Sequence, residues 1–360
     1  MFKHVLYDKI NNISYHNRYD FQYHFKGNLD TDVEFRPDNN LWDFLDWETE
    51  PSESFNELKK ERALQLREKY KYLILMYSGG ADSSTVLNTF LKNNIPIDEI
   101  LTITFKRVNS SKLILPTYDI TAFNKLKIIS DRFPKTKITF VNKTFDDYYK
   151  FITRSDELVF KTNAHRSLGQ YLRLPEDIYP LDFIMNSNTG IIHCENKPAI
   201  KIYDKKYYSI IFCAALMSKS SNMDLFFTSI DYPKLQIKQS HMVKNYLIKN
   251  KLGFNRFLSD SQSQDSKDLL AKICRDTVIE PYKLFSTRES ENTKESMNLD
   301  NPYSELGRIA KAMKEDNRFA YDAYHNGIRE NNTESTTTHR YGRHKYGIGL
   351  RKDFFLGKEK

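Results

Sequence analysis

Short apolar runs alternate with helix-forming segments through the first half of the chain. Apolar runs span 72–77, 99–105 and 137–141, and segments rich in helix-forming residues span 57–70 and about 120–133. Strands that alternate with helices along a chain form a parallel sheet with helices on its faces. The pattern therefore predicts an α/β fold with a doubly wound, mostly parallel sheet.

The flanking segments show other patterns. A fourth strand is expected at 190–193, and a hairpin at 199–203 and 206–210. A helix is expected from Pro233, with an apolar stripe at Leu235, Met242, Val243, Tyr246 and Leu247. The first 55 or so residues lack periodicity, and we expect a cap packed by the aromatics Phe35, Trp42, Phe44 and Trp47.

These patterns divide the chain into four parts. We expect an N-terminal cap at 1–58, the main α/β domain at 59–210, a largely helical region at 211–330 and a basic, aromatic tail at 331–360. The 360 residues, 39% of them hydrophobic, are enough for one sizeable core with extensions.

Charge and cysteine content narrow the class of protein. The formal net charge of +8 favours anionic partners. Cys194, Cys213 and Cys274 lie far apart without C-x-x-C spacing, which argues against a disulfide framework and a cysteine-built zinc site. The first residues lack a signal-peptide apolar region, and the longest apolar run, 210–217, is too short to span a bilayer. We expect a soluble, cytoplasmic protein without a membrane partner.

The most informative segment is the turn between the first strand and the next helix, Ser78-Gly-Gly-Ala-Asp-Ser83. Gly79 and Gly80 allow a tight turn and a close approach to a phosphate, toward which the N–H groups of the helix N-terminus point. Ser78, Ser83 and Ser84 add hydroxyl donors. A carboxylate beside phosphate favours a bridging Mg²⁺, so Asp82 is the candidate metal ligand.

These six residues resemble the S-G-G-x-D-S signature of the PP-loop ATP pyrophosphatases (N-type, adenine nucleotide alpha hydrolase-like), which include asparagine, GMP and NAD synthetases. The segments 61–70 and 232–239 resemble stand-alone phage-encoded asparagine synthetase-like members of this superfamily. The resemblance implies a Rossmann-like HUP/PP-loop domain that binds ATP and Mg²⁺ and splits ATP between the α- and β-phosphates. It further implies that Ser78, Gly79, Gly80, Ser83 and Ser84 grip pyrophosphate, that Asp82 holds magnesium, and that adenine lies near Met76, Tyr77, Thr104 and Phe105.

A second group of polar residues follows the expected fourth strand. Ligands of open α/β sheets bind beyond the carboxyl ends of the strands, so Glu195 and Lys197 are expected near the nucleotide. The segment resembles a turn in phage-encoded PP-loop proteins, which implies that Lys197 neutralises the departing pyrophosphate and that Glu195 is a second metal or substrate contact. The alternative is a solvated turn before Pro198.

The segment 339–351 interleaves cations with aromatics. This composition is compatible with three roles. The segment could stack on bases and contact phosphates of a nucleic acid, fold over the active site as a lid, or form a plain basic terminus.

Taken together, the sequence favours an AMP-forming, synthetase-like ligase. It would adenylate a small molecule or a modified base for amide or amine transfer. Sulfur transfer is disfavoured because the cysteines are not paired. A Walker A motif is absent, which argues against γ-phosphate transfer. The alternative is a nucleotide-sensing, nucleic-acid-binding protein that keeps the loop without turnover.

Overall fold

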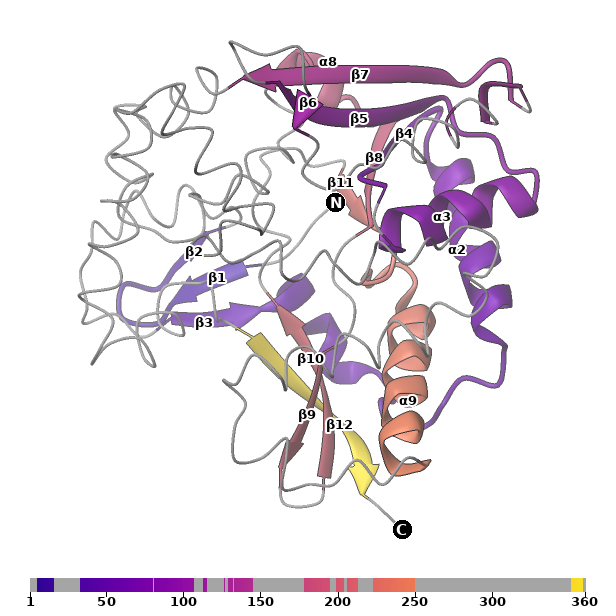
Figure 1. Cartoon of the computed structure of the whole chain (residues 1–360). Coiled ribbons are helices and arrows are strands. Elements are labelled where there is room, and N and C mark those ends of the chain that lie inside the picture. The colour runs from indigo at the N-terminus through magenta and orange to yellow at the C-terminus, as the bar shows by residue number, and fades with distance from the viewer. Residues whose placement is uncertain are drawn as a thin grey trace.

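The computed structural model describes residues 5–15, 33–79, 81–106, 113–114, 126, 129–131, 133–144, 178–194, 199–203, 206–212, 223–249 and 351–358. Within these ranges the largest element is a sheet of five parallel strands and one short antiparallel strand (Figure 1). The parallel strands are β4 (Tyr72–Met76), β5 (Glu99–Lys106), β7 (Lys137–Thr144), β8 (Thr189–His193) and β11 (Met223–Leu225), and the antiparallel strand is β6 (Leu113–Ile114).

The order of the parallel strands is β7-β5-β4-β8-β11. The chain thus starts in the middle of the sheet at β4, moves outward through β5 and β7, and returns to the other side of β4 for β8 and β11. β6 lies beyond the end of β4, along the same edge of β5, because β7 occupies the full length of the other edge. The direction of winding reverses between β4 and β8, and this gap is the topological switch point at which open α/β sheets bind ligands.

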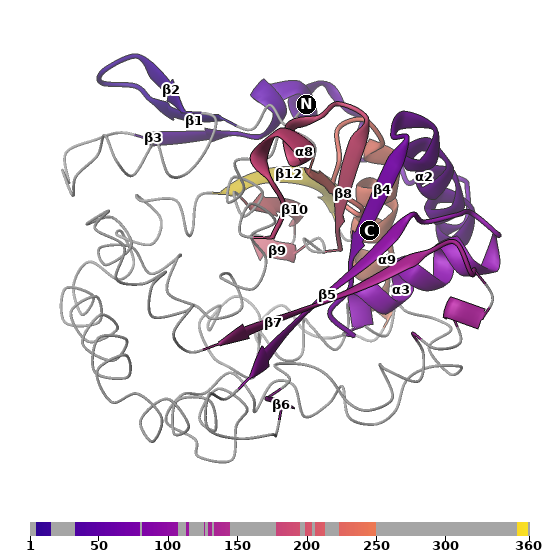
Figure 2. The same ribbon diagram turned by 90° about the horizontal axis from the view of Figure 1, so that it is seen from above.

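Helices lie on both faces of this sheet, as the doubly wound prediction requires (Figure 2). Leu73 and Leu75 of β4, together with Tyr77 just after it, point into one core with helices α2 (Phe55–Lys69) and α3 (Ala81–Lys92). Alternate residues point the other way, where the Tyr72 ring meets Phe183 of α8 (Leu181–Met185) edge-on at 5.8 Å. The sequence-based prediction of a Rossmann-like α/β sheet is therefore confirmed.

Helix α2 begins with a capping box. The Glu57 N–H donates to Ser54 Oγ at 3.3 Å, and the Ser54 N–H donates to the Glu57 carboxylate at 2.8 Å. The helix ends at Lys69, two residues before β4, so the predicted order of helix and buried strand is confirmed.

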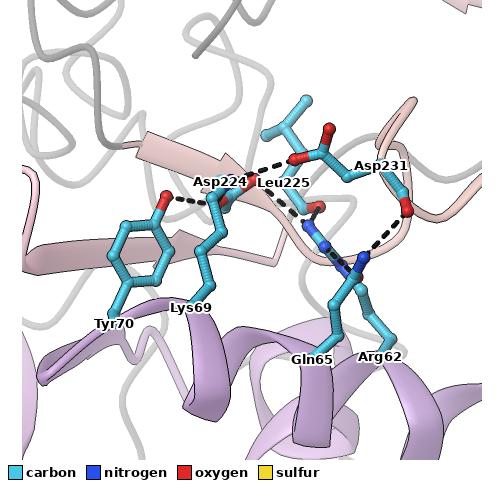
Figure 3. Close-up of polar contacts among 7 residues, drawn as sticks. All are labelled: Arg62, Gln65, Lys69, Tyr70, Asp224, Leu225 and Asp231. Atoms are coloured by element: carbon cyan, nitrogen blue, oxygen red, sulfur yellow. Dashed lines mark hydrogen bonds and ion pairs between the residues drawn. The ribbon is translucent and has the colours of Figure 1, made fainter.

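A buried ionic network joins α2 to the outermost strand β11 (Figure 3). The Asp224 carboxylate accepts hydrogen bonds from Arg62 Nη2 at 3.2 Å, Lys69 Nζ at 3.0 Å and the Tyr70 hydroxyl at 2.5 Å. Arg62 is fully buried and also donates to the Leu225 carbonyl at 3.1 Å. Burial alone would raise the pKa of Asp224, but the Arg62 and Lys69 charges outweigh it and hold this pKa below its usual value. The network fixes α2 across the sheet.

A second layer contains β9 (Ala199–Tyr203), β10 (Lys206–Phe212) and β12 (Arg351–Lys358), in the antiparallel order β12-β10-β9. The predicted hairpin of β9 and β10 is confirmed. Helix α9 (Pro233–Lys249) packs beside this sheet, with Ser240 Oγ 2.8 Å from Ser209 Oγ and Lys244 Nζ donating to the Leu356 carbonyl at 2.6 Å. The strand β12 was not anticipated within the segment 331–360, and β11, within 211–330, adds a strand to the main sheet.

The N-terminal segment forms a small sheet of order β2-β1-β3, made of β1 (Val5–Asp8), β2 (Ile13–Tyr15) and β3 (Val33–Arg36), followed by the 3-10 helix η1 (Pro37–Phe44). Trp42 and Trp47 are buried as expected of a cap packed by aromatics, whereas Phe44 is 84% exposed. Trp47 stacks on Phe354 of β12 at 4.4 Å. The side chain of Phe35 lies outside the described part.

In the described ranges, no helix combines the length and the apolar character needed to cross a membrane.

Candidate functional site

The Ser-Gly-Gly-Ala-Asp-Ser segment lies at the switch point of the sheet. Strand β4 ends at Met76 and helix α3 begins at Ala81, so residues 77–80 form a loop at the carboxyl end of β4. Across the switch point, Cys194 at the end of β8 donates its thiol to the Met76 carbonyl at 3.8 Å. The predicted sequence of strand, loop and helix is confirmed, and the loop occupies the position at which this class of sheet binds ligands.

Gly79 makes the turn from strand to helix. Its φ of 70° lies in the left-handed region, which glycine adopts without the strain that a Cβ would add. Gly80 lies outside the described residues. The loop therefore depends on glycine at position 79 for its backbone shape.

The first turn of α3 holds the loop from one side. Ser83 Oγ accepts the Ser78 N–H at 3.2 Å and lies 3.2 Å from Ser78 Oγ. Ser84 Oγ donates to the Gly79 carbonyl at 3.4 Å. The Ser83 and Ser84 residues are only 2% and 4% exposed. In this structure both hydroxyls shape the loop, and their contact with pyrophosphate stays a prediction.

Strand β5 holds the loop from the other side. The Tyr77 N–H donates to the Leu101 carbonyl at 2.8 Å, and Thr102 Oγ1 donates to the Tyr77 carbonyl at 3.3 Å. The Tyr77 ring is 2% exposed and belongs to the core beneath α2 and α3, with its hydroxyl 3.4 Å from Ser84 Oγ. Burial raises the pKa of this phenol above its usual value, so the group stays neutral. Contact of Tyr77 with adenine likewise stays a prediction.

Ser78 and Asp82 are the more accessible polar residues of the loop and helix start. Ser78 is exposed, and Asp82 is partly exposed in the first turn of α3. Among the described residues, no group of three or more His, Cys, Asp or Glu side chains could hold a metal ion. A single carboxylate flanked by hydroxyls fits Mg²⁺, which usually takes one or two carboxylates together with phosphate oxygens and water. The residues present therefore fit the expected cation.

The remaining predicted site residues are placed only in part. Phe105 lies near the carboxyl end of β5, and its side chain is outside the described part, as is that of Thr104. Glu195 and Lys197 lie outside the described residues, directly after Cys194. Residues 331–350, which include most of the basic, aromatic segment, also lie outside them.

Thr102 contacts the loop at Tyr77, and Cys194 contacts Met76 at the end of β4, but neither was selected from the sequence. Cys194 directly follows β8, so the signal that would have found it is a thiol after a predicted neighbouring strand, since such ends gather at one edge of a parallel sheet. Thr102 lies inside β5, one residue beyond the partner of Met76, and only the register of β5 with β4 places it beside the loop.

No protein-family model and no curated protein matches the chain. Among solved structures, the chain is similar to an NH3-dependent NAD synthetase from Campylobacter jejuni subsp. jejuni NCTC 11168, in complex with the nitrate ion. The sequences are 13% identical, the match covers 66% of this chain and 99% of that chain, and the TM-score is 0.33. The strand order and the helices that lie on both faces of the sheet show a doubly wound α/β fold.

Proposed function

We propose that the protein is an AMP-forming, synthetase-like ligase of the PP-loop type. It binds Mg·ATP at the loop 77–80 and transfers the adenylyl group to a substrate. The activated substrate then reacts with a nitrogen nucleophile in an amide- or amine-forming step. The substrate class that we propose is a small molecule or a modified base.

The observation that carries this proposal is the position of the loop. A glycine in the left-handed conformation leads into the N-terminus of α3 at the switch point of the sheet. N–H groups at a helix N-terminus and the positive end of the helix dipole favour a bound phosphate. The Ser78 hydroxyl adds an exposed hydrogen-bonding group at the same place.

The proposed chemistry is displacement at the α-phosphorus. A substrate oxygen forms a bond to this phosphorus, the bond from it to the bridging oxygen of the β-phosphate breaks, and pyrophosphate leaves with the electron pair. The role of the loop is to hold the pyrophosphate in line as negative charge builds on it. Mg²⁺ held by Asp82 and phosphate oxygens would supply further stabilisation of that charge.

Three further assignments complete the proposal. Lys197 contributes a positive charge to the leaving pyrophosphate, and Glu195 is a second contact to metal or substrate. Phe105 contacts the adenine from the carboxyl end of β5. Their support is the topology, because β5 and β8 both flank β4, and open sheets bind ligands at the edge where the carboxyl ends of their strands lie.

Product analysis tests the reaction. The purified protein is incubated with Mg·ATP and a cell extract, and the nucleotide products are separated. AMP and pyrophosphate are expected, and the extract can then be fractionated for the substrate. ADP and phosphate would overturn the mechanism. Tight ATP binding without turnover would favour the alternative of a nucleotide-sensing, nucleic-acid-binding protein.

The Asp82→Ala variant tests the metal assignment. It is expected to lose Mg·ATP turnover while it remains folded, because the carboxylate that holds the cation is gone. Asp182→Ala is the matched control, since Asp182 is an exposed carboxylate on α8, on the other face of the sheet. Unchanged turnover in Asp82→Ala would rule out the metal assignment.

A further inference from the structure

The phenol of Tyr77 lies beneath the phosphate loop, where the proposed function gives it no catalytic task. We infer that Tyr77 is a positioning residue, whose buried hydroxyl acts through Ser84 on the Gly79 carbonyl and so sets the loop shape that receives the phosphates. This inference rests on the proposed function for its effect on nucleotide binding.

The direction of the hydrogen bonds in this relay follows from the number of protons. Ser84 has a single hydroxyl proton, and it donates that proton to the Gly79 carbonyl at 3.4 Å. The contact of 3.4 Å between the Ser84 and Tyr77 oxygens therefore has Tyr77 as its donor. Both contacts lie at the long end of the range for hydrogen bonds between oxygens.

The position of the Tyr77 hydroxyl is fixed by the core. The ring is 2% exposed and belongs to the same cluster as Val86 and Leu87 of α3, so the phenol is packed on the helix side of β4. Burial raises the pKa of Tyr77, which keeps the proton that the relay needs. A tightly packed ring cannot follow a displaced loop, and it therefore acts as a fixed reference for Ser84.

The target of the relay is the backbone at Gly79. A left-handed residue without a side chain has wide conformational freedom, and the cost of fixing it is entropic. Holding the Gly79 carbonyl fixes the plane of the peptide unit to which it belongs. The loop is then ordered before the nucleotide arrives, and less of the binding free energy is spent on ordering it.

The main variant is Tyr77→Phe, which removes the hydroxyl and keeps the ring. Tyr72→Phe is the matched control, because Tyr72 lies on the same strand β4 and its hydroxyl donates to Glu99 at 2.7 Å, at the opposite end of the sheet. Two quantities are measured: the affinity for Mg·ATP by calorimetry, and hydrogen exchange of backbone amides in residues 77–83 without nucleotide.

Tyr77→Phe is expected to weaken Mg·ATP binding about fivefold, which corresponds to about 1 kcal/mol. It should also speed amide exchange in residues 77–83. Tyr72→Phe should change neither quantity. Wild-type affinity together with wild-type exchange in Tyr77→Phe would overturn the inference. Failure of the wild-type protein to bind Mg·ATP would count against the proposed function alone, because the exchange measurement still decides whether Tyr77 orders the loop.

Ser84→Ala provides the second variant and tests the relay itself. If Tyr77 acts through Ser84, Ser84→Ala should reproduce the faster amide exchange in residues 77–83. The double variant Tyr77→Phe/Ser84→Ala should then exchange no faster than Ser84→Ala alone. Additive effects of the two substitutions would show that the hydroxyls act separately, and the relay would be wrong.

Discussion

The ring of Tyr70 lies directly against the backbone of Gly190. A Cβ placed on Gly190 would stand 2.2 Å from Tyr70 Cδ2, closer than any real contact permits. Because position 190 has no side chain, the ring can cross strand β8 and bring its hydroxyl to Asp224 on β11. The buried network around Asp224 thus depends on a glycine of β8, the strand next to β11.

Gly190→Ala is expected to destabilise the protein by at least about 1–3 kcal/mol, the usual range for an overpacked core. The reason is the clash with Tyr70, which must move away from Asp224. Urea unfolding measures the change in the free energy of unfolding. In a Tyr70→Ala background the same substitution should have little further effect, because the ring that it meets is gone. An equal loss in both backgrounds would contradict the proposed cause.

Arg62→Met is expected to destabilise the protein by about 3–5 kcal/mol, because it leaves the buried Asp224 carboxylate without its most buried partner. Lys69→Met should have a smaller effect, since the Lys69 side chain is 30% exposed. The double variant Arg62→Met/Asp224→Leu should recover much of the loss by removing both buried charges. Chemical unfolding compares these variants, and a double variant less stable than Arg62→Met would contradict this account.

Lys59 gives the protein a pH dependence on the alkaline side. Lys59 lies on α2 and is 6% exposed, and its ammonium group lies 4.8 Å from the centre of the Phe55 ring. Its burial, and next the positive charge of Lys92, lower the pKa of Lys59 to about 8. Between about 8 and the ordinary value of 10.5, the unfolded chain binds more protons than the folded chain, so the contribution of Lys59 to stability rises with pH. Below about 8 the unfavourable burial of the charge is fully present.

Lys59→Met should therefore raise the free energy of unfolding by about 2–3 kcal/mol at neutral pH, after allowance for the lost contact with Phe55. The advantage over the wild-type protein should shrink as the pH rises above about 8. Lys60→Met is the control, because its exposed neighbouring side chain should change stability little at any pH. A constant advantage of Lys59→Met across this pH range would contradict the linkage to Lys59.

Phe354→Ala should loosen the contact between the N-terminal segment and β12. Phe354 is 5% exposed and stacks on Trp47, so truncation is expected to destabilise this layer by about 3–5 kcal/mol. The chain has two tryptophans, Trp42 and Trp47, whose rings are 5.6 Å apart, so tryptophan fluorescence reports on this layer. Emission should shift to the red in Phe354→Ala and much less in Phe355→Ala, where the ring is partly exposed. Equal shifts would contradict the assigned contact.

The sequence predicted those elements whose signals are local. Strand β4 is a continuous apolar run, and the glycines and serines that follow it indicate the loop directly. Strand β11 was missed because it has only three residues with Asp224 in the middle, and the Arg62 guanidinium that compensates this charge is 162 positions away. Likewise, the sequence of β12 on its own indicates a charged tail, because the strand forms only by pairing with β10, which is far away in the sequence.

In the candidate site, too, the sequence predicted what depends on local signals and missed what depends on distant residues. The motif predicted the loop between a strand and a helix, but it could not show which hydroxyls face the ligand and which hold the backbone. The inward position of the Tyr77 ring depends on the alternation of side chains along β4 and on the packing of α3. The contacts of Thr102 with Tyr77 and of Cys194 with Met76 depend on the register of strands β5 and β8 with β4, which no single segment encodes.

The pairing of β10 with β12 has a consequence for how the chain folds during its synthesis. Strand β10 ends at Phe212, and its partner begins at Arg351. All described strands of the sheet that carries the loop 77–80 have been translated by Leu225, so these strands can assemble while the ribosome is still at work. Trp47 can stack on Phe354 only after β12 has been translated. Until then the apolar face of Trp47 is exposed to nascent-chain chaperones and to misfolding.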